Sequence, residues 1–274
     1  MMQKANASEN SAVIQVAGNV VNGLSLTECE RLFNLLFSEN FPKLDAIARA
    51  TAEEHVADFV KITFKKLEEK IDRINADRLA EPDAQSTYNI AIQAVAKKGR
   101  KIDIDLLGDL LQSRLETNNT DYIDNCIEAA VEMVPKLTKE MLFLVPTLHF
   151  IQAIKFNPPY TMQLIDSCYG AVFDNYMAKC QNVSVSMLST MGAIGVGSYI
   201  NIMGSNTFQT YCAKYQLGNT EQTKSNVPNM YKTLQLYDQK QFHKLTLTAP
   251  GQIIAIKLLQ KIIPQIDMGN AFQQ

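Results

Sequence analysis

The sequence predicts a mainly α protein: a multi-helix bundle with a short N-terminal strand or hairpin and a small winged-helix-like C-terminal element. Apolar residues recur at intervals of three and four along most of the chain, and Ser, Thr or Asp precedes many of these runs. One segment alone is rich in β-branched residues without that spacing. We expect an N-terminal tail and strand over 1–24, a helical domain over 25–157 and a mostly helical region over 158–274.

The strand is expected at residues 13–21, which read VIQVAGNVV and lead into the turn-forming pair Asn22-Gly23. A lone strand cannot satisfy its own backbone groups, so it must pair with a distant strand or with a second copy of the protein. The candidate interaction residues in it are Val13, Ile14 and Val16.

Two helices follow. Residues 25–28, Ser-Leu-Thr-Glu, form a capping box that begins a helix reaching about Ser38. Pro42 suits the start of a second helix, whose apolar stripe runs over 44–74, about 50 Å at 1.5 Å per residue. A stripe of this length needs several helices beside it or a second subunit. Its candidate interaction residues are Phe64, Leu67 and Ile71.

A basic cluster ends the next helix, which begins after Pro82 and reaches Lys98. Gly99 permits a left-handed cap, and cations suit the negative end of the helix dipole. The alternative reading is an anion or nucleic-acid contact. The cluster consists of Lys97, Lys98, Arg100 and Lys101.

Three capped helices are expected next. They start at Asp103 or Asp105, at Thr120 and at Thr138, and Pro146 should kink or split the third. Residues 157–159, Asn-Pro-Pro, form the expected boundary between the two halves.

The C-terminal region contains a charge-free stretch between Lys179 and Lys214, after a helix over about 160–179. Its segment 183–204 is apolar but diluted with Ser, Gly and Asn, and it is marginal as a membrane span. It is read as a buried, tightly packed turn and helix, with inducible membrane insertion or a small-residue helix interface as alternatives. Polar residues 216–230 suggest an exposed loop, and 245–263 an extended entry, a turn at Pro250-Gly251 and a closing helix.

Charge and composition exclude several classes. With 26 Lys and Arg against 28 Asp and Glu, the formal net charge is -2, which disfavours a dedicated nucleic-acid binder. The five cysteines are widely spaced and form no CxxC pair, so we expect reduced thiols in a cytoplasmic protein. His149 is expected to be a hydrogen-bonded core residue, and His55 and His243 to be exposed. We predict no catalytic residues, no metal site and no cofactor, and do not exclude an enzyme.

Several segments, taken together, carry a resemblance to known families. The opening IQVAGNVVNGLSLTECERLFNLLFSENFPKLDAIARATAEEHV, the central IDIDLLGDLLQSRLE, the step VPKLTKEML and the final LTLTAPGQIIAI resemble an uncharacterised bacterial family known by LPO/Vpar locus labels. They also look like the helical architecture of Abi-alpha-type abortive-infection proteins. This chain departs from the last motif by carrying Ala249-Pro250 before Gly251. The resemblance implies a bacterial cytoplasmic protein tied to phage defence, and it carries over no catalytic residue.

These observations predict a non-enzymatic protein that self-associates as a homo-oligomer and recognises a protein partner. Together with the resemblance, they predict a role as an anti-phage defence component. A defence effector that perturbs membranes through 183–204 is the second hypothesis. A nucleic-acid sensor acting through the basic cluster is the third, and the overall charge disfavours it.

Overall fold

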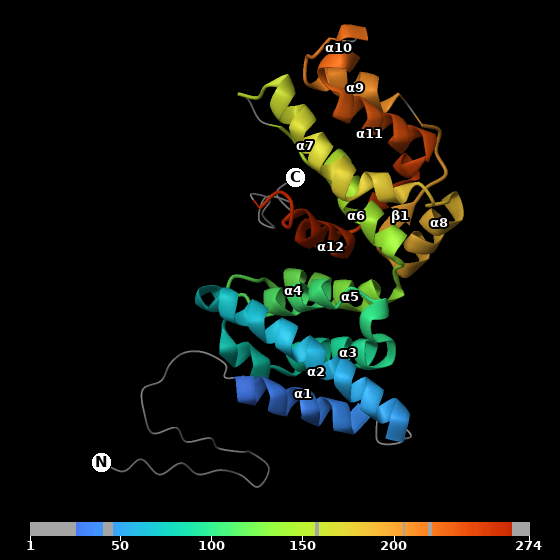
Figure 1. Cartoon of the computed structure of the whole chain (residues 1–274). Coiled ribbons are helices and arrows are strands. Elements are labelled where there is room, and N and C mark those ends of the chain that lie inside the picture. The colour runs from blue at the N-terminus through green and yellow to red at the C-terminus, as the bar shows by residue number, and fades with distance from the viewer. Residues whose placement is uncertain (1–25, 41–45, 157–158, 205, 219–220, 265–274) are drawn as a thin grey trace, which may run out of the picture.

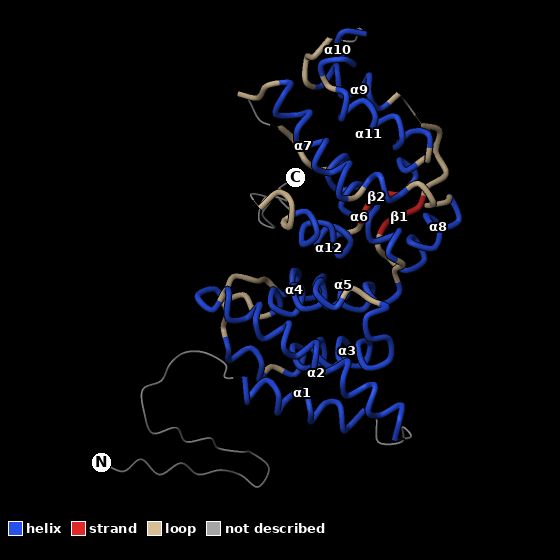
Figure 2. Tube along the Cα trace, viewed as in Figure 1, coloured by secondary structure: helices blue, strands red, loops and turns tan. Residues whose placement is uncertain are grey.

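The computed structural model describes residues 26–40, 46–156, 159–204, 206–218 and 221–264. The predicted strand at 13–21, with Val13, Ile14 and Val16, lies outside the described residues. Within them, the chain is mainly α-helical, as the sequence predicts. The helices stack along one long axis, with α1 at one end and α9, α10 and α11 at the other (Figures 1 and 2).

Among the described residues, the N-terminal part of the stack contains five α-helices. Their bounds are α1 Leu26–Asn40, α2 Ala46–Glu69, α3 Pro82–Lys98, α4 Ile104–Arg114 and α5 Asp121–Met133. Helix α2 packs against α1, α3 and α4, and α4 packs against α5. Short 3-10 segments connect several of them, including Ile71–Arg73, Ala76–Ala80 and Gly99–Lys101.

The capping residues confirm the predicted helix starts. The Asp103 side chain accepts a hydrogen bond from the Leu106 amide at the start of α4, and Thr120 caps α5 in the same way. Gly99 follows α3 with φ at +53°, as expected of a glycine at a helix end. A β-carbon there would lie 2.4 Å from the His55 ring, so the close contact also requires glycine.

Helix α2 ends earlier than the sequence suggests. The apolar stripe predicts a continuous helix to Ile74, but the α-helix stops at Glu69 and Ile71–Arg73 forms a 3-10 turn. Ile74 then makes an isolated antiparallel bridge to Glu116. At 1.5 Å per residue the 24-residue helix is about 36 Å long. Its stripe is covered by α1, α3 and α4 of the same chain, which is the first of the two possibilities that its length left open.

Over the residues that the structure describes, the C-terminal part adds seven α-helices and a small sheet. Their bounds are α6 Lys139–Gln152, α7 Met162–Asn175, α8 Val185–Ile194, α9 Thr207–Lys214, α10 Glu221–Asn226, α11 Pro228–Gln239 and α12 Ala249–Leu259. Helix α6 continues through Pro146 and is not split. Helix α7 is shorter than predicted, and a 3-10 segment, Met177–Cys180, follows it.

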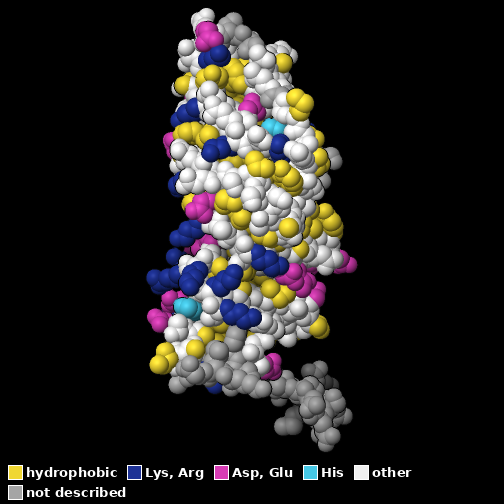
Figure 3. All heavy atoms as spheres, turned by 90° about the vertical axis from the view of Figure 1, so that its right-hand side faces the viewer, with side chains coloured by type: hydrophobic (Ala, Val, Ile, Leu, Met, Phe, Trp, Pro, Cys, Tyr) yellow, Lys and Arg dark blue, Asp and Glu magenta, His cyan; other side chains and the backbone are white. Residues whose placement is uncertain are grey.

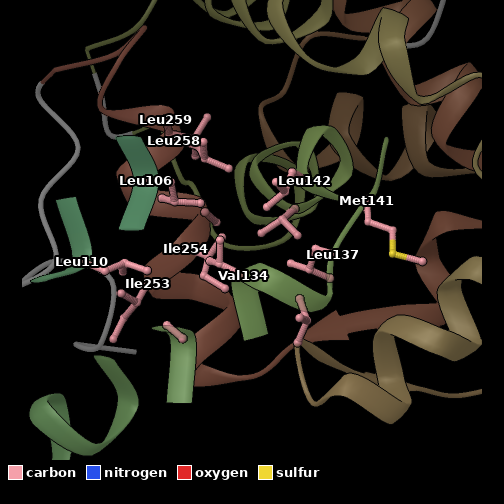
Figure 4. Close-up of a cluster of buried hydrophobic side chains, with 14 of the residues drawn as sticks. Leu106, Leu110, Val134, Leu137, Met141, Leu142, Ile253, Ile254, Leu258 and Leu259 are labelled. Atoms are coloured by element: carbon pink, nitrogen blue, oxygen red, sulfur yellow. The ribbon is translucent and has the colours of Figure 1, made fainter. Parts of the chain in front are cut away.

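Helix α12 joins the two parts of the stack. It packs against α4 and α5 on one side and α6 on the other, and its side chains from Ile253 to Leu259 are buried. Figure 4 shows Ile253, Ile254 and Leu258 beside leucines of α4 and α6. The C-terminal helix thus contacts helices from both sides of residue 157, and its buried side chains belong to the same hydrophobic cluster as theirs.

The exposed loop predicted at 216–230 is wrong. This segment contains α10 and the start of α11, and Val227 and Met230 are fully buried. Pro228 occupies the first turn of α11, where its missing amide costs no hydrogen bond. Glu221, Gln222, Ser225 and Asn226 of this segment face solvent, which explains why the segment reads as a loop.

A two-stranded antiparallel sheet joins distant segments. Strand β1 (Gly197–Tyr199) pairs with β2 (Leu245–Leu247), so that Gly197 faces Leu247 and Tyr199 faces Leu245. The predicted turn at Pro250-Gly251 is instead the first turn of α12, capped by Thr248. The C-terminal element expected to resemble a winged helix is thus a strand paired with a distant segment and followed by a core helix.

Candidate interaction surface

The predicted interaction residues of the long stripe do not lie together on the surface. Leu67 is 3% exposed, and Phe64 is half-buried against the same core. Ile71, in the 3-10 turn after α2, is 40% exposed. The chain's own helices thus cover the stripe, and of the three residues only Ile71 presents a large part of its side chain to solvent.

The predicted basic cluster is partly used in holding the fold together. Lys98 donates a hydrogen bond from Nζ to the Pro135 carbonyl oxygen over 2.5 Å, and the Arg100 guanidinium lies 3.1 Å from the Asp58 carboxylate. Lys97 and Lys101 are exposed. Figure 3 shows a band of Lys and Arg side chains across one face of the molecule, below its middle.

The charge-free segment 183–204 lies largely at the surface. In α8 only Leu188 and Met191 are buried, and its outward residues include Ser and Thr. This corrects the expectation of a buried, tightly packed turn and helix. In the described chain, no helix has the length and apolar character needed to cross a membrane.

Helix α8 ends at a glycine, and the chain then enters strand β1 of the sheet. Gly195 ends the helix in the left-handed conformation, with φ at +97°, and its amide and that of Val196 donate to the Met191 carbonyl. Beyond β1, the Ile200 amide donates to the Lys244 carbonyl over 2.8 Å. The pairing to β2 therefore continues just past the strand and positions the residues that follow.

Those following residues, 200–204, form a surface that we call the apolar loop. Ile200 is 55% exposed, Ile202 51% and Met203 97%. Single exposed apolar side chains are common on soluble proteins, but three within four consecutive residues are a patch. On the face shown in Figure 3, hydrophobic side chains above the basic band are interspersed with polar ones and some charged ones.

A hollow of about 470 Å³ lies beside the apolar loop. Ile202 and Met203 line it from the loop, Asp238 lines it from the end of α11, and His243 and Lys244 line it from the 3-10 turn before β2. Asp238 is already engaged, since it accepts hydrogen bonds from the Thr207 amide and hydroxyl. The hollow therefore combines an apolar wall with a few polar groups.

His243 packs closely under this loop. A β-carbon on Gly204 would lie 2.5 Å from its ring, so a glycine is required for the approach. Both ring nitrogens of His243 are buried and lack a hydrogen-bond partner in the described part of the chain. His243 and His55 are half-buried, in contrast to the exposed positions predicted for them.

The remaining candidate groups for chemistry are buried singly. His149 is 1% exposed, and neither ring nitrogen has a hydrogen-bond partner among the described residues, contrary to the predicted hydrogen-bonded state. Its burial lowers its pKa to about 4, so the ring is neutral at pH 7. Burial also raises the pKa of the Cys180 thiol to about 12. Within the described ranges, no three His, Cys, Asp or Glu side chains are placed to hold a metal ion.

Comparison with known proteins assigns the chain to a family. A family model described as ":-like" matches residues 23–222, which is most of the chain, so the chain belongs to this uncharacterised family. The description names no activity. No curated protein and no solved structure matches the chain significantly. The similarity to Abi-alpha-type proteins is not among these findings.

The apolar loop is the surface that reasoning from the sequence did not single out. The lack of charge in this segment is visible in the sequence, but hydropathy alone does not distinguish buried from exposed isoleucines. The alternation of small and β-branched residues over 194–202 was the available signal for a strand, and its partner at 245–247 was also read as extended.

Proposed function

We propose that this protein is a non-enzymatic recognition protein that self-associates and binds a protein partner through the apolar loop. The observation that carries the proposal is the exposure of Ile200, Ile202 and Met203 in an uncharged segment held in place by the β1–β2 sheet. A cluster of exposed apolar side chains is typical of an interaction site.

The energetics favour covering this patch. Burying a full Ile or Met side chain contributes about 1.5–3 kcal/mol, so the three partly exposed side chains could contribute about 3–6 kcal/mol per copy. Association also costs free energy, because the two molecules lose translational and rotational freedom. Residues beside the loop must therefore also be buried for the complex to be stable.

A second copy of the chain is the first partner to test. Residues 181–213 contain no Asp, Glu, Lys or Arg, so two loops related by a twofold axis would meet without opposing like charges. An uncharged apolar patch is in this sense self-complementary.

The test is the solution mass of the full chain, by light scattering over a range of concentrations. We expect a defined oligomer of the 30.6 kDa chain, and a Met203→Glu variant whose dissociation constant is raised at least about tenfold. Met203 is 97% exposed, so the substitution leaves the core intact.

Leu164→Glu is the matched control. Leu164 is 50% exposed on α7, so this variant places the same charge on another exposed apolar position. Circular dichroism verifies that both variants fold. A monomeric wild-type chain, or an oligomer that Met203→Glu and Leu164→Glu weaken equally, would contradict the proposal.

The strand predicted at residues 13–21 is a separate candidate for a contact between copies. We propose that residues 13–21 add a backbone contact between copies, and a chain lacking residues 1–24 should then dissociate more readily. Leu67→Glu is not a useful test of assembly, because Leu67 is buried and its replacement would destabilise the monomer.

The proposed cellular role is bacterial anti-phage defence, in the cytoplasm. Only the resemblance of the sequence motifs supports this part. Phage plating on cells that carry the wild-type gene or the Met203→Glu variant tests it: protection by the first and not by the second is expected, and no protection by either would contradict it.

A further inference from the structure

A second cavity, of about 440 Å³, lies at the junction between the two parts of the stack, away from the apolar loop. Cavities that hold small molecules usually measure about 300–1,000 Å³. Four separate segments build its wall: residues 100–105, the start of α6, the end of α7 and the end of α12. We call it the junction pocket.

The inner wall of the junction pocket is apolar. Figure 4 shows three of its residues, Leu137, Leu142 and Leu258, within the cluster that surrounds α12. Tyr176 adds an aromatic ring, and its hydroxyl is already used, since it donates to the Leu258 carbonyl over 2.5 Å. The wall therefore suits an alkyl or aromatic group and offers little to a polar one.

The charged groups at the pocket differ in whether they are already paired. The two acidic ones are occupied: Asp103 caps α4, and Asp105 lies 2.8 Å from the Lys66 ammonium and also pairs with Lys261. Arg100 pairs with Asp58.

Two cations at the pocket are not engaged. Lys101 and Lys139 are exposed, and neither forms an ion pair or side-chain hydrogen bond that involves another residue of the described part of the chain. Lys179 lies close by, with its ammonium 4.9 Å from the centre of the Phe143 ring. The charge available to a ligand is therefore positive.

We propose that the junction pocket binds a small amphipathic anion, with an alkyl or aromatic body against the inner wall and a carboxylate or similar acidic group between Lys101 and Lys139. An apolar body gains from leaving water, and the two ammonium groups select for a negative head. The recessed shape favours a free molecule over the surface of a bilayer. This inference does not depend on the apolar loop or on self-association.

The absence of tryptophan from the chain permits a specific reporter. Phe143→Trp places a single indole at the pocket as a conservative aromatic replacement, and its fluorescence is followed while decanoate or decanol is added to the full chain. Leu164→Trp, on the exposed face of α7, is the control reporter. We expect the fluorescence of the Phe143→Trp variant to change saturably as decanoate is added, and that of the Leu164→Trp variant to stay constant.

The head group is tested by removing the two ammonium groups. In the Phe143→Trp background, Lys101→Ala with Lys139→Ala should weaken decanoate binding about tenfold and leave decanol binding unchanged. Lys97→Ala with Lys136→Ala removes two exposed charges nearby that do not line the pocket, and it should change neither.

Three results would overturn the proposal. One is the lack of a saturable change with decanoate below its micelle-forming range; another is an equal response from the two reporters. The third is unchanged decanoate affinity after both lysines are removed. Phosphatidylglycerol vesicles are added in a separate experiment. A fluorescence change of Phe143→Trp with vesicles but not with free decanoate would indicate that the pocket binds a membrane surface, and would contradict the proposal of a free small ligand.

Discussion

A buried network of charges around Arg114 provides the sharpest test of the packing. The Arg114 side chain is 2% exposed and that of Asp124 8%. Arg114 Nη2 lies 2.5 Å from the Asp83 carboxylate, and Nη1 lies 2.9 Å from the Asp124 carboxylate, as an ion pair rather than a hydrogen bond. Asp124 also contacts Arg78 and accepts a hydrogen bond from Asn119 over 2.9 Å. One carboxylate therefore compensates two guanidinium groups.

Replacement of Asp124 by Ala should lower the free energy of unfolding by about 3 kcal/mol, because it removes the buried carboxylate that the Arg114 and Arg78 guanidinium groups share. The general range for this change is about 3–5 kcal/mol. We expect its lower end, because Asp83 still faces Arg114 and its side chain is 64% exposed to water. Arg114→Met with Asp124→Leu should recover part of the loss, because both charges are then absent.

Equilibrium unfolding in urea, followed by circular dichroism, measures the change. Glu53→Ala is the matched control: it removes the surface pair between Arg49 and Glu53, whose side chains are 42% and 52% exposed, and should cost less than about 0.5 kcal/mol. If Asp124→Ala costs no more than Glu53→Ala, the network is solvated in solution and the reasoning fails.

Two further predictions concern the core. Burial lowers the pKa of His149 from 6.5 to about 4, so the unfolded chain binds a proton at this residue at a higher pH than the folded chain does. The free energy of unfolding should therefore fall by about 3 kcal/mol in total as the pH drops from about 6.5 to about 4. Urea unfolding of His149→Met should show a flatter pH profile and higher stability at pH 7; an unchanged profile would contradict this. Gly251→Ala should destabilise by about 3 kcal/mol or more, since its β-carbon would lie 2.0 Å from the Val196 carbonyl oxygen. Gly108→Ala, whose β-carbon would meet the end of the Lys66 side chain at 3.1 Å and an Ile62 methyl group at 3.5 Å, should be near neutral in the same urea unfolding, and equal losses would refute the argument.

Much of the secondary structure could be predicted from local signals. Helix α3 runs from Pro82 to Lys98, between the proline and the glycine that mark its ends. Asp103, Thr120 and Thr138 cap helices as predicted, because a cap depends on a few neighbouring residues. The prediction is wrong where local and tertiary preferences differ. The segment that forms α10 and the start of α11 is rich in polar residues and is therefore predicted to be a loop, although Met230 in it is buried.

The candidate surfaces were less predictable. The stripe of α2 was read correctly as apolar, but which neighbours cover Leu67 depends on how α1, α3 and α4 fold back against it. Of the basic cluster, Lys101 lines the junction pocket together with Lys139, which lies 38 positions further along the chain, and no spacing rule brings these two together.

The sequence by itself determined the mainly α class, the ends of α3, the capped starts of α4, α5 and α6 and the charge balance, because these follow from residue type and short-range spacing. Only the tertiary structure decided that α12 completes the core of the N-terminal part, that β1 pairs with β2, and that Ile200, Ile202 and Met203 remain exposed. The physical reason is that burial and pairing arise between residues far apart in the chain. An isoleucine in a charge-free segment has the same hydropathy whether another helix covers it or not.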